Sequence, residues 1–285
     1  MENVIELQHI QKSFNGFQIK DFSIHVKKGF VTGFIGGNGA GKSTTIKMIM
    51  NLLQQDSGTI SIFGKSYKKH EKEIKERIGF VYDENIFYEN ITLKDMKKII
   101  KPAYRRWDDK AFQHYVEQFE LPLNKNMKTF SKGMKMKASL AIALAHHAEL
   151  IIMDEPTSGL DPIFRRELLN ILHELMQDGD KTIFFSTHIT TDLDRIADYI
   201  TFIHNGEHIF TKEFYKIQEE YAIVKGTLDL LDRETEQEFV ALRKTNRGFE
   251  ALTANKHRAA TIFGDTVVVE KPTLEDIMYY TKKGW

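Results

Sequence analysis

Residues 36–43 read Gly36-Gly37-Asn38-Gly39-Ala40-Gly41-Lys42-Ser43. The stretch fits the pattern G-x-x-x-x-G-K-[ST] and lies between an apolar run ending at Ile35 and a helical pattern starting near Ser43. Its glycines let backbone N–H groups turn toward an anion, and the start of the helix adds partial positive charge. The stretch therefore predicts a phosphate-binding loop, in which Lys42 contacts the β- and γ-phosphates and Ser43 binds Mg²⁺.

Two acids at the end of an apolar run form a second motif. Leu150-Ile151-Ile152-Met153 is followed by Asp154-Glu155. A buried strand that ends beside the phosphate loop makes Asp154 a ligand of Mg²⁺ or of its water, and Glu155 the general base that polarises the attacking water. Two solvated acids at a strand end are the alternative, and the phosphate loop makes the catalytic interpretation the stronger one.

The order of predicted elements indicates an α/β core that a helical insert interrupts. The predicted strands of this core are 4–10, 17–26, 30–35, 59–63, 149–153, 182–186 and 199–204. The pattern is helical between about 88 and 147, and from 148 to 211 strands and helices alternate, as in parallel sheets with crossover helices. Residues 212–285 repeat a smaller pattern, with strands at 222–225, 248–253 and 266–270 separated by helical stretches, which predicts a small second α/β domain.

The amino-acid composition excludes several classes of protein and of site. The 285 residues include 40 basic and 40 acidic side chains, a balance that argues against nucleic acid as the main partner. No cysteine is present, so thiolate metal sites and disulfides are excluded. The start of the chain lacks the apolar core of a signal peptide, and no apolar run reaches the roughly 18–20 residues of a membrane span. A function at a membrane would therefore need another chain to cross it.

Three further motifs complete a family pattern. Phe130-Ser131-Lys132-Gly133-Met134 precedes the acid pair, and Ser158-Gly159-Leu160-Asp161 and Ser186-Thr187-His188 follow it. In this order, the five motifs resemble the ATPase subunits of ABC transporters over residues 1–211. The S-K-G-M form and the long C-terminal appendage resemble the ABC-2-type exporter branch, which includes exporters of antimicrobial or cytolytic peptides and antibiotics. The resemblance implies a P-loop NTPase core with an antiparallel β subdomain and a helical insert at about 88–147, plus a small C-terminal α/β accessory domain at 212–285.

The resemblance also implies roles for single residues. Glu155, His188 and Lys42 are the expected catalytic residues. The expected ATP-binding residues are Phe14, Gly36, Gly37, Asn38, Gly39, Ala40, Gly41, Lys42, Ser43 and Thr44. The expected signature, which grips the γ-phosphate of the opposite subunit, is Ser131, Lys132, Gly133 and Met134, and Asp161 marks the D-loop. Phe14 is expected to stack on adenine, with core packing as the alternative, and His188 to contact the γ-phosphate, with a structural histidine as the alternative.

Two segments depart from the family pattern. The signature has Lys132 and Met134 where the family often has Gly and Gln, although the phosphate-contacting Ser131 and Gly133 are kept. The usual glutamine of the Q-loop is missing: Asp83 aligns best with it and Glu84 is the next residue. Either carboxylate is a possible Mg²⁺ ligand, and two solvated loop acids are the alternative. Residues 86–88, large and apolar, form either part of a groove for a membrane partner or part of an internal seam.

The sequence thus predicts the ATP-binding and ATP-hydrolysing subunit of an ABC exporter, with Mg²⁺ as cofactor. Its expected partners are ATP, a second ATPase subunit in a homo- or heterodimer, and separate transmembrane permease subunits, with no nucleic acid. The expected location is cytoplasmic, peripheral on the inner face of the cell membrane. The alternative is a soluble ABC ATPase in cofactor assembly, DNA repair or translation. A single cassette without a coiled coil or zinc module disfavours the translation and repair forms.

Overall fold

The computed structural model describes residues 2–81, 90–177 and 179–283. Its contacts divide the chain into two compact units, Met1–Thr211 and Lys212–Trp285, which are considered separately. No helix within the described ranges is both long enough and apolar enough to cross a membrane.

The core of the first unit is a six-stranded sheet with the order β5-β6-β7-β3-β8-β9. Its strands are β3 (Val31–Ile35), β5 (Ile78–Val81), β6 (Leu150–Asp154), β7 (Thr182–Thr187), β8 (Tyr199–His204) and β9 (Glu207–Glu213). The pairs β5/β6, β6/β7, β7/β3 and β3/β8 are parallel. Every residue of β3, β6 and β7 is buried, which explains why these strands read as continuous apolar runs rather than as alternating ones.

A second, antiparallel sheet in this unit has the order β2-β1-β4. It consists of β1 (Asn3–Phe14), β2 (Phe17–Lys27) and β4 (Ser57–Ile62). The Asn15-Gly16 turn joins β1 to β2, and Gly16 takes a φ of 85°, which suits a tight hairpin turn. One face of the sheet, including Ile5, Leu7 and Phe22, belongs to the core.

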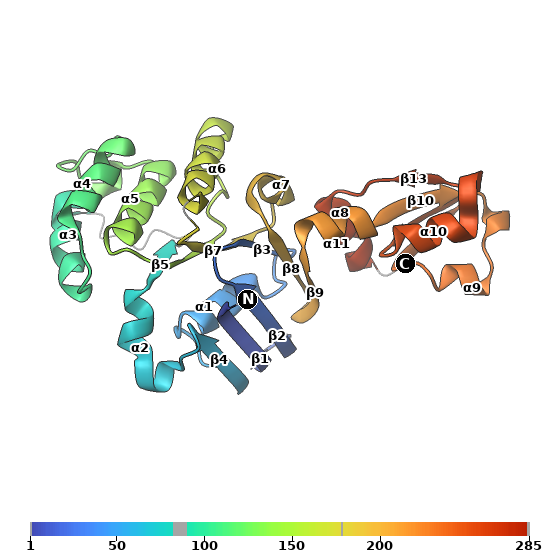
Figure 1. Cartoon of the computed structure of the whole chain (residues 1–285), viewed down its shortest axis with the longest axis horizontal. Helices are drawn as coiled ribbons and strands as arrows, with labels where there is room; N and C mark the ends of the chain where they lie inside the picture. Colours follow the sequence, from blue (N-terminus) through green and yellow to red (C-terminus); the bar gives the residue numbers. More distant parts are fainter. Residues whose placement is uncertain (1, 82–89, 178, 284–285) are drawn as a thin grey trace. The chain divides into compact units, whose positions relative to one another are not determined.

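Helices surround the central sheet. They are α1 (Lys42–Ile49), α2 (Tyr67–Glu76), α3 (Leu93–Ile100), α4 (Asp109–Gln118), α5 (Lys132–Ala145), α6 (Pro162–Met176) and α7 (Leu193–Ile196). Short 3-10 turns lie at Lys101–Ala103, Met127–Thr129 and Thr190–Asp192. Figure 1 shows α3, α4 and α5 grouped at one end of the unit, away from β1, β2 and β4. These three helices form the predicted helical insert.

The second unit is a four-stranded antiparallel sheet with helices. The strand order is β11-β12-β10-β13, with β10 (Ala222–Gly226), β11 (Ala241–Thr245), β12 (Gly248–Thr253) and β13 (Val268–Glu270). The helices are α8 (Phe214–Glu220), α9 (Arg233–Glu236), α10 (Lys256–Phe263) and α11 (Leu274–Lys283). Val224, Phe249 and Phe263 pack in its core. Thr273 begins α11 as predicted, since its hydroxyl accepts a hydrogen bond from the N–H of Asp276 at 3.1 Å.

The structure confirms the predicted fold class and corrects two details. The stretch between β10 and β12, expected to be helical, contains only the four-residue α9 and then strand β11. The strand was missed because it lies at the edge of its sheet and exposes Arg243, Lys244 and Thr245, so it shows no apolar run. Strand β9 was also missed, because its buried and partly buried positions do not alternate cleanly.

Candidate nucleotide-binding and catalytic site

The strand order brings three separate motifs to one edge of the sheet. β6, β7 and β3 are consecutive in the sheet and parallel. Their carboxyl ends therefore lie side by side, and the segments that follow them meet there. The phosphate loop follows β3, the acid pair ends β6, and His188 follows β7.

The phosphate loop depends on its glycines. Gly39 and Gly41 take φ values of 77° and 112°, in the left-handed region that favours glycine. A Cβ at Gly36 would lie 2.6 Å from the carbonyl oxygen of Ile203. The N–H and the hydroxyl of Thr45 both donate to the Gly41 carbonyl at 2.9 Å, which starts α1 directly after the loop. The loop thus leads into the N-terminus of an eight-residue helix, an arrangement that favours anions.

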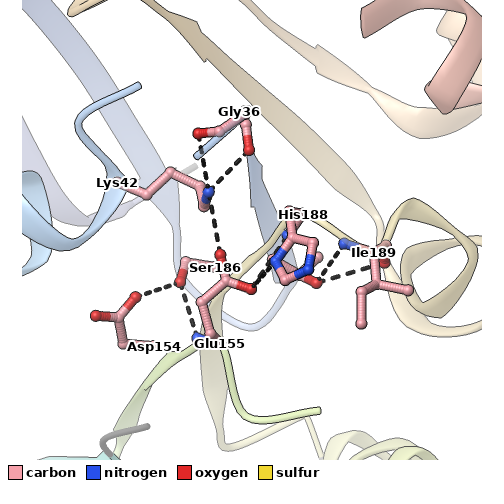
Figure 2. Close-up of polar contacts among 9 residues, drawn as sticks. Gly36, Lys42, Asp154, Glu155, Ser186, His188 and Ile189 are labelled. Carbon is pink, nitrogen blue, oxygen red and sulfur yellow. Dashed lines mark hydrogen bonds and ion pairs between the residues drawn. The ribbon is translucent and has the colours of Figure 1, made fainter. Parts of the chain in front are cut away.

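Lys42 is held by the loop and by the acid pair. Its ammonium donates to the carbonyl of Gly36 at 2.8 Å and lies 3.4 Å from that of Gly37. The same nitrogen is 3.0 Å from Oε1 of Glu155, and both side chains are largely buried. Figure 2 shows Lys42 pointing from α1 across the site toward Glu155. A phosphate in the site would compete with Glu155 for this ammonium group.

The backbone and the carboxylate of Glu155 are held by residues at the end of β7 and directly after it. Its φ of 48° lies in the left-handed region, a conformation that costs a non-glycine residue about 1–3 kcal/mol. Its N–H is 3.1 Å from both the carbonyl and the hydroxyl of Ser186. Oε2 of Glu155 lies 2.6 Å from Nδ1 of His188 and accepts from the His188 N–H at 3.2 Å. The carboxylate therefore bridges Lys42 and His188 (Figure 2).

Asp154 is the most buried acid of the site. Its side chain is 3% exposed, and Oδ1 accepts a hydrogen bond from the Ser186 hydroxyl at 2.6 Å. Burial raises the pKa of the Asp154 carboxyl, whereas hydrogen bonds from Ser186 and Ser43 act in the opposite direction. Burial and the neighbouring Glu155 charge outweigh these hydrogen bonds and the charge of Lys42, so the pKa of Asp154 lies above its usual value.

The donor set around Asp154 fits a magnesium ion. The Ser43 hydroxyl and the Asp154 carboxylate are hard oxygen donors that lie within hydrogen-bonding reach of each other. In the described residues no group of three or more His, Cys, Asp or Glu side chains could hold a metal ion. Mg²⁺ takes one or two protein ligands and completes its shell with phosphates and waters. Asp83 and Glu84, the predicted further ligands, lie outside the described residues.

A cavity of about 670 Å³ lies between the phosphate loop, Glu155 and His188. It is lined by Gly16, Phe17, Gly37, Asn38, Gly39, Gly41, Lys42, Ser43, Thr44, Glu155, Ser158 and His188. Most of the predicted phosphate-loop residues, including Lys42, are therefore brought together with the other two predicted catalytic residues, Glu155 and His188. Gly36 and Ala40 belong to the loop but do not line the cavity.

The hairpin between β1 and β2 contributes aromatic rings. Phe14 is 44% exposed, which excludes the alternative that it packs in the core. Its ring stacks beside that of Phe17, with centroids 6.4 Å apart and planes at 27°. Phe17 lines the cavity and Phe14 does not. Sequence analysis missed Phe17, although a second aromatic residue directly after the Asn15-Gly16 turn was the available signal.

The signature residues lie apart from this cavity. Ser131 begins α5, and its hydroxyl accepts from the N–H of Met134 at 3.2 Å. Gly133 is buried against the ring of Phe164, since a Cβ there would lie 2.7 Å from that ring. Neither these residues nor Lys132 lines the cavity. A signature that takes part in phosphate binding would thus serve another site than the one in its own chain.

Asp161 has a clear local role. Its Oδ1 accepts hydrogen bonds from the N–H groups of Ile163 and Phe164 at 3.1 and 3.0 Å. Pro162 occupies the first position of α6. Asp161 therefore caps this helix, and its backbone marks where the segment after the acid pair turns into α6.

Comparison with known proteins identifies a matching family, and relatives that match about three quarters of the chain. A family model described as "ABC transporter" matches residues 19–158. The bacitracin transport ATP-binding protein BcrA of Bacillus licheniformis is 37% identical over 212 residues, 73% of this chain and 69% of that protein. The lantibiotic transport ATP-binding protein SrtF of Streptococcus pyogenes is 32% identical over 74% of this chain and 91% of its own length.

Solved structures agree with these sequence matches. A structure described as the ATP binding subunit of an ABC transporter superposes with a TM-score of 0.68 at 29% identity, covering 76% of this chain and 92% of its own. A nucleotide-free ATP-binding cassette from an ABC transporter gives a TM-score of 0.64 at 24% identity over 74% and 92% of the two chains, which shows a shared fold.

Proposed function

We propose that closure of an ATP-bound dimer of this chain moves separate membrane subunits. The proposal starts from the family: the chain belongs to the ABC transporter family and is the ATP-hydrolysing subunit of an exporter. The observation that carries the proposal is the meeting of Lys42, Glu155 and His188 around one cavity that the phosphate loop lines. A cation, a base and a polar histidine beside an anion-binding loop are the groups that phosphoryl transfer needs.

ATP binding uses both ends of the cavity. The triphosphate lies on the loop N–H groups and the N-terminus of α1, and Lys42 turns from Glu155 to the β- and γ-phosphates. The base stacks on the aromatic rings of the hairpin, where Phe14 and Phe17 are adjacent. Stacking a base on an aromatic side chain is worth about 1–3 kcal/mol.

Ser43 and Asp154 are the residues that would hold the magnesium ion of Mg-ATP. When bound, Mg²⁺ supplies positive charge to the phosphate oxygens. Its charge also favours the ionised carboxylate of Asp154, which burial otherwise disfavours. Ser186 donates to Asp154 and keeps that carboxylate oriented.

Hydrolysis follows from the placement of Glu155. Once Lys42 has turned to the phosphates, Glu155 accepts a proton from a water molecule whose oxygen bonds to the γ-phosphorus. The bond from that phosphorus to the ADP oxygen breaks at the same centre, which yields ADP and inorganic phosphate. His188 holds Glu155 through Nδ1 and lines the same cavity, where we expect its other ring nitrogen to contact the γ-phosphate.

The signature acts on a second subunit. Ser131, Lys132, Gly133 and Met134 lie outside this chain's own cavity, as expected if they close over the ATP of a partner cassette. The exposed Ser131 at the start of α5 and the helix N-terminus suit the γ-phosphate of that ATP. Asp161 caps α6, and Phe164 of that helix packs against Gly133 of the signature. Two cassettes, identical or related, would thus share two ATP molecules.

The proposed role in membrane transport is supported by the similar proteins. Both BcrA and SrtF are described as transport ATP-binding proteins, which favours an exporter over a soluble ATPase in cofactor assembly, DNA repair or translation. Permease subunits that cross the membrane are then separate chains, and this chain lies on the inner face of the cell membrane. The names of the relatives also suggest the class of cargo, namely peptide antibiotics such as bacitracin and lantibiotics.

Purification from native membranes tests this proposal. The tagged chain should sediment with membranes and, after mild detergent extraction, co-purify with polytopic membrane proteins that mass spectrometry identifies. Cells that lack the chain should become more sensitive to bacitracin or to a lantibiotic. A chain that remains in the supernatant and brings down no membrane protein would contradict the transport function.

A further inference from the structure

An ion pair between a partly buried arginine and a buried carboxylate lies outside the cavity. Nε of Arg165, in α6, donates to Oδ1 of Asp192 at 2.5 Å, and its Nη2 donates to the Thr191 hydroxyl at 2.9 Å. The Asp192 side chain is 2% exposed, and its Oδ2 has no hydrogen-bond partner among the described residues. A buried carboxylate with one oxygen unpaired depends strongly on the cation that it faces.

The pair fixes the segment that follows His188. Asp192 ends the 3-10 turn Thr190–Asp192, four residues after His188. The next residue, Leu193, is fully buried against β3, where its Cδ1 would lie 2.6 Å from a Cβ at Gly33. The segment is therefore held to the central sheet by Leu193 and to α6 by Arg165.

Hydrogen bonds carry this anchoring back to His188. The N–H of Asp192 donates to the carbonyl of Ile189 at 3.3 Å, and the N–H of Ile189 donates to the Thr187 hydroxyl at 2.9 Å. His188, between those two residues, places Nδ1 and its N–H on Oε2 of Glu155 (Figure 2). The orientation of the imidazole thus depends on a short segment whose far end is Asp192.

The same turn of α6 also contacts the signature helix. The N–H of Arg165 donates to the carbonyl of Asp161 at 2.9 Å, so Arg165 lies one turn after that cap. Its neighbour Phe164 lies against Gly133. Lys137 of α5 lies 5.1 Å from the centre of the Phe164 ring and pairs with Glu167 of α6 at 2.7 Å. One turn of helix therefore packs against the signature and, through Arg165, against the segment after His188.

We propose that Arg165 is a positioning residue for hydrolysis: through Asp192 it sets His188 against Glu155 and connects that contact to the signature helix. The inference rests on the proposed function, because it assigns the role of Arg165 within ATP hydrolysis. A rearrangement at the signature would reach the γ-phosphate end of the cavity through Phe164, Arg165 and Asp192. Displacing a catalytic group by about 1 Å can cost about 10²-fold in rate, which sets the size of the expected effect.

The decisive variant removes the charge pair without leaving a lone buried charge. Arg165→Met combined with Asp192→Leu replaces a buried ion pair by apolar side chains of similar size, a change that is often neutral for stability. Arg166→Met is the matched control, because Arg166 is the next residue of the same helix and its side chain is exposed. Arg165→Lys retains a charge for Asp192 but not the planar fork that also reaches Thr191.

The full chain is assayed with Mg-ATP and by NMR of its histidine side chains. The double variant should keep the wild-type melting temperature and KM for ATP, while kcat falls about 10- to 100-fold. Arg165→Lys should show a smaller loss, and Arg166→Met none. The ring signals of His188, assigned with a His188→Gln variant, should shift in the double variant and in Arg165→Lys but not in the control.

Two results would overturn the inference. One is a wild-type kcat in a double variant of normal stability. The other is a set of unchanged His188 ring signals in either Arg165 variant, a readout that needs no ATPase activity and remains decisive if the double variant folds poorly. A wild-type chain that hydrolyses no ATP while its His188 signals respond to Arg165 would instead count against the proposed function alone.

Discussion

Glu155 and Lys42 form an ion pair, with Oε1 3.0 Å from Nζ, across the mouth of the phosphate loop. The two groups have separate tasks in the proposed reaction, since Lys42 serves phosphates and Glu155 serves water. The carboxylate of Glu155 and the bound triphosphate therefore compete for the ammonium group of Lys42. In the proposed reaction, ATP binding releases Glu155 to act as the base, and the contact with Nδ1 of His188 keeps the released carboxylate in place.

Lys42→Ala should weaken ATP binding strongly, because the cavity loses the buried cation that the triphosphate would contact. Isothermal titration of the purified chain with Mg-ATP measures the effect. Lys47→Ala, on the same helix but outside the cavity lining, is the control and should bind as the wild type does. An unchanged dissociation constant for Lys42→Ala would show that the loop does not cradle the phosphates.

Phe14→Ala and Phe17→Ala should each weaken binding of ATP more than binding of inorganic triphosphate, because only ATP has a base to stack. We expect losses of about 1–3 kcal/mol for the ring that contacts the base. The cavity lining predicts that Phe17 contributes at least as much as Phe14. Equal losses for ATP and triphosphate in both variants would rule out stacking and indicate a role in holding the hairpin.

Asp154→Asn should raise the melting temperature of the protein without nucleotide at pH 7. Burial raises the pKa of Asp154 in the folded protein, so its ionisation destabilises the fold as the pH rises through that pKa. The advantage of Asn should therefore shrink as the pH is lowered from 7 and Asp154 becomes protonated. Asp229→Asn, at an exposed position, is the control. A lower melting temperature for Asp154→Asn at pH 7 would contradict the assignment of burial as the dominant effect.

Asp154→Asn should also reduce the stabilisation that Mg-ATP provides, since Asn has no charge for the metal. This second measurement separates a ligand role from a purely structural one. If Mg-ATP raises the melting temperature of the variant and of the wild type equally, Asp154 does not act on the metal.

Ser131→Arg should leave ATP binding by the isolated subunit intact but abolish hydrolysis, because the phosphate that Ser131 meets belongs to a partner cassette. Loss of the helix cap costs about 1 kcal/mol, so the fold should survive. Ser66→Arg replaces another serine helix cap, that of α2, away from the cavity, and should retain activity. Equal loss of ATP binding in the isolated subunit would place the signature in its own chain's site instead.

Contiguous motifs made much of this site predictable from sequence. Residues 36–43 carry the phosphate loop in one run, and Asp154-Glu155 follow a strand whose burial on both faces leaves an unbroken apolar signal. Contacts between distant residues gave no such signal. Arg165 and Asp192 are 27 positions apart, and each looks like an ordinary charged residue until the fold buries one against the other.

Other features that the sequence did not predict also have physical causes. The ion pair between Lys42 and Glu155 depends on the parallel order of β6, β7 and β3, which periodicity does not reveal. The edge strand β11 has charged outward residues, so its pattern resembled a solvated stretch. Phe17 has the pattern of an ordinary strand residue, because its place in the cavity depends on the turn of the hairpin.

The most direct measurement of the central claim is steady-state ATP hydrolysis and oligomeric state of Glu155→Gln beside wild type and Glu219→Gln, an exposed carboxylate of α8. Removing a general base typically costs about 10²–10⁴-fold in rate. The variant should also bind Mg-ATP at least as tightly as wild type, because it no longer competes for Lys42, and should accumulate as an ATP-bound dimer. Wild-type turnover by Glu155→Gln would show that Glu155 is not the catalytic base and would contradict the account.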